Sequence, residues 1–241
     1  MTKYKLVFED TFKIDGKPDP SIWTYEIGEK WANNESQCYV DDLSNCYIKD
    51  GILNIVATLH DREKCKYQSA RINTMGKKHF KYGKFVIRAK MPHGKGSWPA
   101  IWFLGTSKLE KVRWPLCGEI DLVEFAGNRK GVVSCAIHTE AYNHKIKTDK
   151  GSRIVLKDAS DAFHDYSLEW TPEFLSFVVD QKEILRVHKE KGDGIEQWPF
   201  DQSFYLILNL AVGGWYGGPI EDADLPYLFQ IQSIKVYEPI G

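Results

Sequence analysis

Short hydrophobic runs separated by turn residues recur along the whole chain. Most of these runs alternate apolar and polar positions or are rich in β-branched residues, a pattern that predicts a β-sandwich. No stretch keeps the apolar period of an amphipathic helix for more than two turns. We therefore expect an all-β fold. The predicted strands cover residues 4–9, 23–27, 52–59, 84–91, 100–104, 119–125, 131–138, 166–170, 174–179, 205–212 and 231–237.

Turn residues mark the ends of several of these runs. Residues 50–51 and 213–214 contain the glycines that tight turns favour, whereas the hairpin tip at 179–183 has no glycine. The composition does not shift along the 241 residues, and no repeat or low-complexity linker interrupts them. We expect one domain over residues 1–241, which is long enough to bury a substantial core.

The predicted strand at 119–125 differs from the others because it carries three carboxylates, Glu119, Asp121 and Glu124. Apolar residues lie between them, so at least one carboxylate must sit where water is restricted. Strict alternation would place Glu119 and Asp121 on one face of the strand and Glu124 on the other. A one-residue bulge near residues 122–123 would return Glu124 to the first face, and bulges are common beside active sites. We predict three acids on one face.

Carboxylates grouped in this way suit glycoside hydrolysis. One ionised carboxylate attacks or stabilises the sugar carbon, while a protonated one gives its proton to the leaving oxygen. Like charges at close range cannot all ionise cheaply, so we expect the pKa of at least one group to be raised. The alternatives are an acidic edge strand or a cation site, although calcium usually takes oxygen ligands from a short loop.

The string Glu-Ile-Asp-Leu-Val-Glu at 119–124 resembles the signature of glycoside hydrolase family 16, in the longer form of its laminarinase-like members. The resemblance implies a jelly roll of two curved antiparallel sheets with a concave substrate cleft. It also implies a retaining, endo-acting hydrolase of β-1,3 or mixed β-1,3/1,4 glucan. Two alternatives stay open: the same mechanism on a galactan or host-type glycan, and a carbohydrate-binding jelly roll without catalysis. Further blocks resemble the family in its own order, at residues 8–12, 33–35, 70–74, 82–84, 88–102, 164–170 and 209–214.

The resemblance assigns roles to the three acids. Glu119 is expected to be the nucleophile, Glu124 the general acid and base, and Asp121 the group that holds Glu119 and adjusts its charge. Catalysis by such a pair requires no cofactor. Asn34, Glu35 and Arg71 fall in blocks that the family uses to bind sugars on the non-reducing side of the cut.

Aromatic residues near the acids are candidate platforms for sugar rings. Trp114 precedes Glu119 by five residues in a predicted loop, where an exposed position is expected. Trp98 is a second candidate, with the core as its alternative, whereas Trp102 is expected in the core. His138 ends the next strand and is a further candidate for the substrate site, where an imidazole is either structural or tunes the proton donor.

Charge and composition favour a neutral polymer as the partner. The formal net charge is −1 with acids and bases interspersed, which provides no field for nucleic acid or an anionic membrane. Aromatic residues make up 13% of the chain, more than enough to leave some for sugar stacking beyond the core. We expect a monomer that binds a polysaccharide or oligosaccharide and neither nucleic acid nor membrane.

The five cysteines are odd in number and irregularly spaced, so we expect free thiols and a reducing compartment. Cys117 near Glu119 is either a nucleophile or, more in keeping with its type, a small buried hydrophobe. The N-terminus lacks the apolar core of a signal peptide, which predicts a cytoplasmic protein, or a secreted one if a signal was removed.

Two positions depart from the family pattern. The usual Gly-Gly-Asn-Trp reads Gly-Gly-Trp-Tyr at residues 213–216, which leaves open whether Trp215 reaches sugar. Many members bind structural calcium through an Asp before the final Val-Tyr pair, and Gln232 stands there in this chain. A neutral amide is a poorer ligand for calcium, so a metal site is doubtful.

Overall fold

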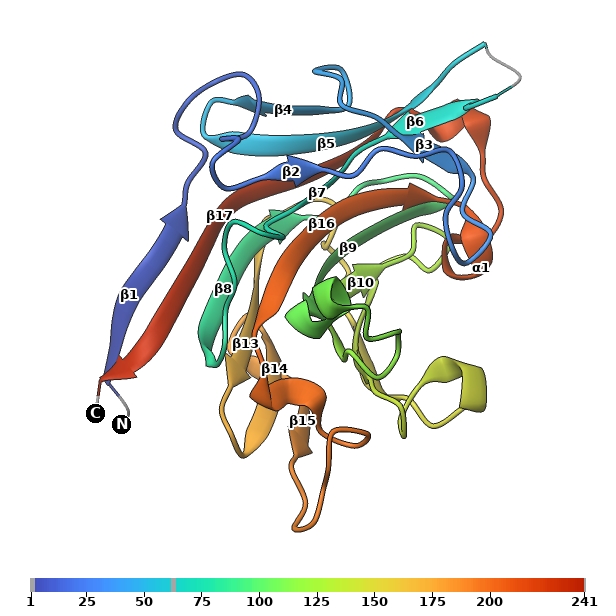
Figure 1. Cartoon of the computed structure of the whole chain (residues 1–241). Coiled ribbons are helices and arrows are strands. Elements are labelled where there is room, and N and C mark those ends of the chain that lie inside the picture. Colours follow the sequence, from blue (N-terminus) through green and yellow to red (C-terminus); the bar gives the residue numbers. More distant parts are fainter. Residues whose placement is uncertain (1–2, 62–63, 241) are drawn as a thin grey trace.

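The computed structural model describes residues 3–61 and 64–240, and within them two curved sheets stack face to face (Figure 1). None of the helices in this part of the chain is long and apolar enough to cross a membrane. The strands are β1 (Lys3–Asp10), β2 (Thr24–Tyr25), β3 (Gln37–Tyr39), β4 (Cys46–Lys49), β5 (Ile52–Leu59), β6 (Tyr67–Ser69), β7 (Arg71–Asn73), β8 (Gly83–Lys90), β9 (Ser97–Gly105), β10 (Glu119–Phe125), β11 (Val132–His138), β12 (Lys150–Val155), β13 (His164–Trp170), β14 (Phe174–Val179), β15 (Lys182–His188), β16 (Phe204–Val212) and β17 (Tyr227–Ile240). The helices are η1 (Thr106–Glu110), η2 (His144–Ile146), η3 (Pro199–Asp201), α1 (Gly214–Gly217) and η4 (Asp222–Asp224).

The larger sheet has the strand order β15-β14-β13-β8-β17-β5-β6-β3, with β1 also paired to β17 and β4 to β5. The smaller sheet has the order β12-β11-β10-β9-β16-β7-β2. Both curve in the same direction, which confirms the predicted sandwich with a concave face (Figure 1). One detail of the prediction is wrong, because β3 and β6 pair in parallel. β5 pairs antiparallel with both β4 and β6, so β4 and β6 run in the same direction. β3 runs in that direction too and therefore pairs in parallel with β6.

The core lies between the two sheets. In β8, alternate residues such as Phe85 are buried. The centre of the Phe85 ring lies 5.2 Å from that of Phe103, in β9 of the other sheet. Every residue of β16 is buried, because one face of that strand packs in the core and the other lies under the cleft. Full burial of each large apolar side chain contributes about 1.5–3 kcal/mol to folding. One face of the smaller sheet therefore packs against the larger sheet in the core, and its other face forms the floor of the cleft.

Each predicted strand is present, but the region 23–27 contains only the two-residue β2. The strands that the sequence pattern did not predict fall into two groups. β3, β4, β6 and β7 have three or four residues each, too few to show an alternation. β12 and β15 lie at sheet edges and are largely exposed and polar, so they lack the apolar run that marks a buried strand.

The prediction of five free thiols is wrong for two of them, since Cys38 and Cys65 form a disulfide. The bond joins β3 to the segment before β6, at the parallel pair of strands. Nothing in the spacing signals this pair, which only the fold brings together. A disulfide removes the reason to expect a reducing compartment. Cys117 is buried, and burial raises the pKa of its thiol to about 11, as expected for a small core residue.

We expect the double substitution Cys38→Ala and Cys65→Ala to lower the free energy of unfolding by about 3 kcal/mol, because it frees a long loop in the unfolded chain. Urea denaturation followed by tryptophan fluorescence measures this change. The wild-type protein with a reductant is the matched control and should lose a similar amount. Equal stability of the oxidised wild type and the double variant would contradict the prediction.

Candidate active site

The acids of β10 share one face because the strand contains a bulge. From Asp121 to Val123, β10 advances two residues while its partner β9 advances only one, from Trp102 to Ile101. The pairing with β11 shifts at the same place. The three carboxylates consequently line one cavity, whereas the apolar residues between them are buried in the core. The predicted bulge and the predicted grouping of the acids are both confirmed.

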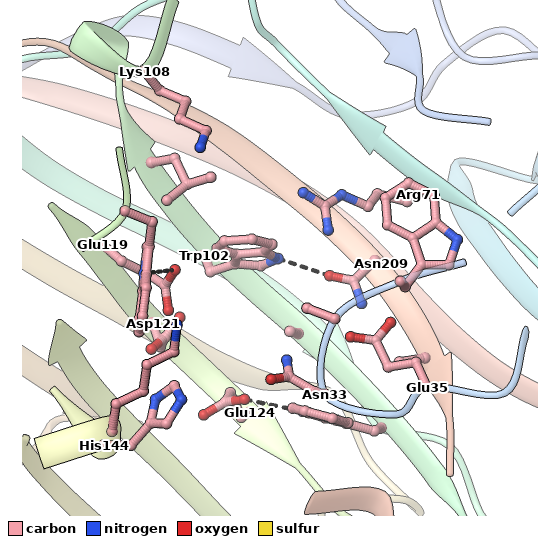
Figure 2. Close-up of a pocket in the computed structure, with 18 residues that line it drawn as sticks. Asn33, Glu35, Arg71, Trp102, Lys108, Glu119, Asp121, Glu124, His144 and Asn209 are labelled. Atoms are coloured by element: carbon pink, nitrogen blue, oxygen red, sulfur yellow. Dashed lines mark hydrogen bonds between the residues drawn. The ribbon is translucent and has the colours of Figure 1, made fainter. Parts of the chain in front are cut away.

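The cavity lies on the concave face of the smaller sheet and has a volume of about 300 Å³ (Figure 2). It extends from the acids of β10 across β9 and β16 to β7. Its walls combine indole rings with planar polar groups, the combination that recognises sugar faces and hydroxyls. The lining residues are Trp31, Ala32, Asn33, Glu35, Arg71, Trp98, Ala100, Trp102, Leu104, Lys108, Trp114, Glu119, Asp121, Glu124, His144, Lys145, Asn209 and Ala211.

Glu119 and Glu124, the first and last of the three acids, each accept a hydrogen bond from an indole. Trp114 Nε1 donates to Glu119 Oε2 at 2.9 Å, and Trp98 Nε1 donates to Glu124 Oε1 at 2.9 Å. A donor of this kind stabilises the ionised carboxylate and fixes its orientation. Trp114 is half-buried and Trp98 is buried, and both hold a carboxylate. Contact of their rings with sugar stays a prediction.

Burial dominates the electrostatics of the cluster. It raises the pKa of Glu119, and the neighbouring charge of Asp121 raises it further. The pKa of Asp121 is raised by burial and then by Glu124, while the pKa of Glu124 is raised by burial and lowered in part by the Trp98 hydrogen bond. Burial and mutual repulsion thus favour protonated carboxyls in the cluster.

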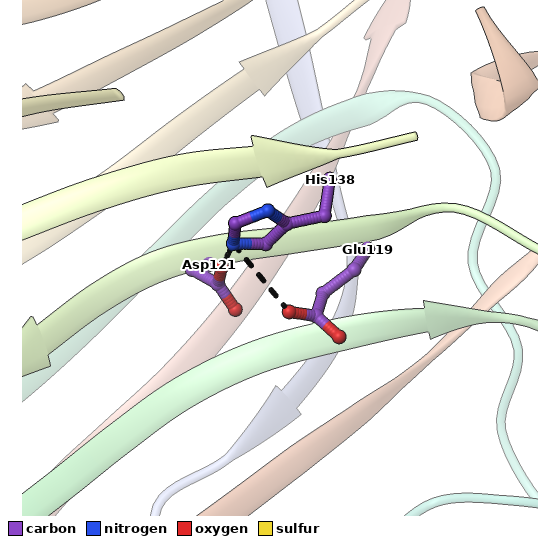
Figure 3. A group of neighbouring side chains, drawn as sticks. All are labelled: Glu119, Asp121 and His138. Atoms are coloured by element: carbon purple, nitrogen blue, oxygen red, sulfur yellow. Dashed lines mark ion pairs between the residues drawn. The ribbon is translucent and has the colours of Figure 1, made fainter. Parts of the chain in front are cut away.

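His138 lies beside the acids, and its side chain is not among those that line the cavity (Figure 3). Its Nε2 is 3.2 Å from Asp121 Oδ2 and 3.8 Å from Glu119 Oε1. Because His138 contacts Asp121 and does not line the cavity, the structure does not support the predicted contact of His138 with substrate. Ligand atoms of these three residues lie within 4.8 Å of one another and could hold a metal ion. A cation there would occupy the carboxylates that hydrolysis needs, so we interpret the group as an acid–base cluster.

The position of the family's calcium ligand does not fit a cation. Gln232 Oε1 accepts a hydrogen bond from Arg88 Nε at 2.9 Å, and Arg88 also pairs with Asp165 at 3.2 Å. A guanidinium at this distance repels a second cation and takes the amide oxygen that would have to bind it.

The comparisons with known proteins agree with this geometry. Residues 44–227 match the family described as glycosyl hydrolases family 16. This chain belongs to that family. A beta-glucanase of Rhodothermus marinus is 39% identical over 97% of the chain and 85% of the relative, and a keratan-sulfate endo-1,4-beta-galactosidase of Sphingobacterium multivorum is 33% identical over 98% and 56%. The crystal structure of the laminarinase from Rhodothermus marinus has a TM-score of 0.96 at 37% identity, over 100% of both chains.

Membership confirms the resemblance noted in the sequence, and the chain is a glycoside hydrolase of the retaining type. A retaining hydrolase needs two carboxyls that face the same glycosidic bond. The grouped acids of β10 are the candidates for that pair.

Arg71 and Glu35 line the end of the family 16 cleft that lies away from the acids (Figure 2). The Arg71 guanidinium lies between the rings of Trp31 and Trp102, at 5.2 and 4.8 Å from their centres, and its Nε is 2.5 Å from Glu26 Oε2. Glu35 accepts a hydrogen bond from Gln37 Nε2 at 2.8 Å. Both predicted residues therefore have fixed positions in the cleft.

Two expectations need correction. Asn34 is exposed and does not line the cavity, where Asn33 lies instead. Both residues adopt a left-handed backbone, with φ of 57° and 63°, so their side chains do not follow an alternation that the sequence could show. Trp102 is half-buried and forms part of the cleft, although a core position was expected. It shares the even-numbered face of β9 with Trp98, whereas Ile101 packs in the core.

Several lining residues had not been predicted from the sequence. Asn209 carried a usable signal, because it is a polar residue inside the apolar run of β16. It accepts a hydrogen bond from Trp102 Nε1 at 2.7 Å. Lys108, His144 and Lys145 come from loops and short helices, where no periodicity indicates which side chains face the cleft.

We expect Trp98→Phe to raise the pKa of Glu124, because the ring is kept but the hydrogen bond to the ionised carboxylate is lost. Carbon-detected NMR titration of the labelled carboxyls measures the pKa. Trp102→Phe is the matched control, since that indole donates to Asn209 and should leave the pKa of Glu124 unchanged. A pKa of Glu124 that stays the same or falls in Trp98→Phe would contradict the assigned role of this bond.

Proposed function

We propose that this family 16 hydrolase is an endo-acting β-glucanase that cleaves β-1,3 or mixed β-1,3/1,4 linkages, with Glu119 and Glu124 as its catalytic pair. The observation that carries the proposal is the bulge of β10, which turns both glutamates toward one cleft. The hydrogen-bonding indole beside each glutamate supports distinct, fixed positions for the two carboxyls.

In the first step, Glu119 attacks the anomeric carbon while Glu124 gives its proton to the leaving oxygen. The glycosidic C–O bond breaks and a glycosyl ester forms on Glu119. Trp114 orients Glu119 and Trp98 orients Glu124 through their hydrogen bonds. Burial raises the pKa of both glutamates, so the assignment of nucleophile and acid follows the order of the two residues in the family signature. The leaving sugar chain departs with the proton from Glu124.

In the second step, the Glu124 carboxylate takes a proton from water, and the water oxygen attacks the anomeric carbon. The ester bond breaks and Glu119 is released as a carboxylate. Two inversions give net retention. We assign Asp121 the role of holding Glu119 and adjusting its charge, because the charge of Asp121 raises the pKa of Glu119. The His138 imidazole lies beside both acids, with Nε2 3.2 Å from Asp121 Oδ2 and 3.8 Å from Glu119 Oε1.

The substrate assignment rests on the cleft and on the relatives. Trp31 and Trp102 offer ring faces on the side of the cleft that we assign to the non-reducing end, with Arg71 and Glu35 as partners for hydroxyls. The beta-glucanase of Rhodothermus marinus is both more similar and more completely covered than the galactosidase. The galactosidase relative keeps a galactan substrate as the second candidate.

We expect laminarin or barley β-glucan to give the fastest release of reducing sugar in a panel that also contains agarose and keratan sulfate. The wild-type protein at one fixed concentration and a Glu119→Gln variant as the blank provide the comparison. Preferential cleavage of keratan sulfate or agarose would select the galactan alternative. Binding without any cleavage would select the carbohydrate-binding alternative.

We expect Glu124→Ala to lose about 10²–10⁴-fold in activity on polysaccharide, because the sugar leaving group needs a proton. An aryl laminaribioside, whose leaving group departs unaided, should still form the glycosyl-enzyme. Azide should then accelerate turnover, since the small anion attacks the intermediate without a general base and gives a β-glycosyl azide. Product analysis by proton NMR identifies the anomer.

The matched variant is Glu119→Ala, which lacks the nucleophile. Azide can then react with the substrate only by direct displacement, which gives the α-glycosyl azide. A β-azide from Glu119→Ala together with an α-azide from Glu124→Ala would reverse the two assigned roles.

A further inference from the structure

The lining of the cleft extends further on one side of the acids than on the other. Away from β11, its lining continues from β10 over β9, β16 and β7. Beyond β10 in the other direction, no described residue of β11 or β12 lines the cavity. The boundary on that side is formed by Trp114 and by His144 and Lys145 of η2. Figure 2 places His144 close to the acids of β10.

His144 packs in a row with two tryptophans: Trp114, which also lines the cavity, and Trp215, which is 54% exposed and is not among the lining residues. The His144 ring lies 5.3 Å from that of Trp114 and 5.7 Å from that of Trp215, at interplanar angles of 36° and 37°. Burial lowers the pKa of His144, which favours the neutral ring that packs in the row. We refer to these three residues as the aromatic row.

The aromatic row joins the surroundings of the two catalytic glutamates. At one end, the Trp114 indole donates to Glu119. At the other, the Trp215 ring packs against Trp98 at 5.7 Å, and Trp98 donates to Glu124. The row therefore passes from the neighbourhood of one acid to that of the other. It occupies the side of the scissile bond that faces away from Arg71.

The loop that carries His144 is held in place. Asn143 is buried, and its Oδ1 accepts a hydrogen bond from the Lys145 N–H at 3.1 Å. Its Nδ2 donates to the carbonyl oxygens of Thr139 and Glu140, each at 3.1 Å. A side chain on such an anchored loop keeps its position, so His144 forms a defined wall of the cleft.

We propose that His144 is a specificity-determining residue that closes the leaving-group side of the cleft and favours leaving groups of one or two sugars. The inference rests on the proposed function, in which the open side over β9, β16 and β7 binds the non-reducing part of the glucan. A longer leaving group would have to pass His144 and the tryptophans that pack beside it. The enzyme still cuts an inner bond of a chain, but it selects bonds near the reducing end.

The test is the cleavage pattern of laminarihexaose labelled with ¹⁸O at its reducing end, followed by mass spectrometry. The wild-type enzyme should release mainly labelled glucose and disaccharide. His144→Ala opens the wall and should raise the ratio of longer to shorter labelled fragments by about tenfold, the scale expected when one pocket contact is removed. Trp215→Ala opens the other end of the aromatic row and should shift the pattern in the same direction.

Two controls separate the aromatic row from general effects of mutation. His144→Phe keeps a ring in the row and should retain the wild-type pattern. Ile146→Ala changes an exposed residue of the same short helix outside the row and should also leave the pattern unchanged. Thermal unfolding of each variant checks that the fold is intact.

An unchanged pattern in folded His144→Ala and Trp215→Ala would overturn the inference and leave the proposed function standing. Wild-type release of mainly long labelled fragments would overturn it as well, since the closed side would then bind the non-reducing end. A wild type that cleaves neither this oligosaccharide nor any glycan of the panel would overturn the proposed function and the inference together.

Discussion

The active site depends on one extra residue in β10. Without the bulge, the period of two along the strand would direct Glu124 into the packed core between the sheets, where an isolated carboxylate is strongly disfavoured. With the bulge, two successive apolar residues, Leu122 and Val123, both face the core, and the acids on either side face the cleft. The irregular backbone thus satisfies the packing of the sandwich and the chemistry of the cleft at once.

The acids work in a setting that opposing effects keep in balance. Burial raises the pKa of each carboxyl and so favours protonation, while the indole donors of Trp98 and Trp114 favour the ionised forms. Each glutamate has an indole donor, and the charge of Asp121 raises the pKa of Glu119 further. The two carboxyls therefore have similar surroundings, and the assignment of their roles follows the order of the acids in the family signature.

The two sides of the cleft are built differently. On the side of Glu35, a chain of hydrogen bonds runs from Glu35 through Tyr39 and Asn209 to Trp102, and it ties the β3 segment to the floor of the smaller sheet. The disulfide ties the same β3 segment to the residues that precede β6. On the other side, the wall comes from loops that combine aromatic packing with the local hydrogen bonds of Asn143. The sugar-binding surface over the sheet is therefore rigid, whereas the loops are free to differ among enzymes of this fold.

The sequence by itself determined the all-β class, the positions of the long strands and the grouping of Glu119, Asp121 and Glu124, because these depend on local alternation and on the cost of placing charges among apolar residues. It also carried the family blocks. The alternation along β9 also indicates that Trp102 shares a face with Trp98, although a core position had been expected for Trp102. The tertiary structure alone decided which residues far apart in the chain meet, such as Cys38 with Cys65 and His144 with Trp114 and Trp215. Loops have no period, and the direction of their side chains depends on contacts that exist only after the sheets have packed.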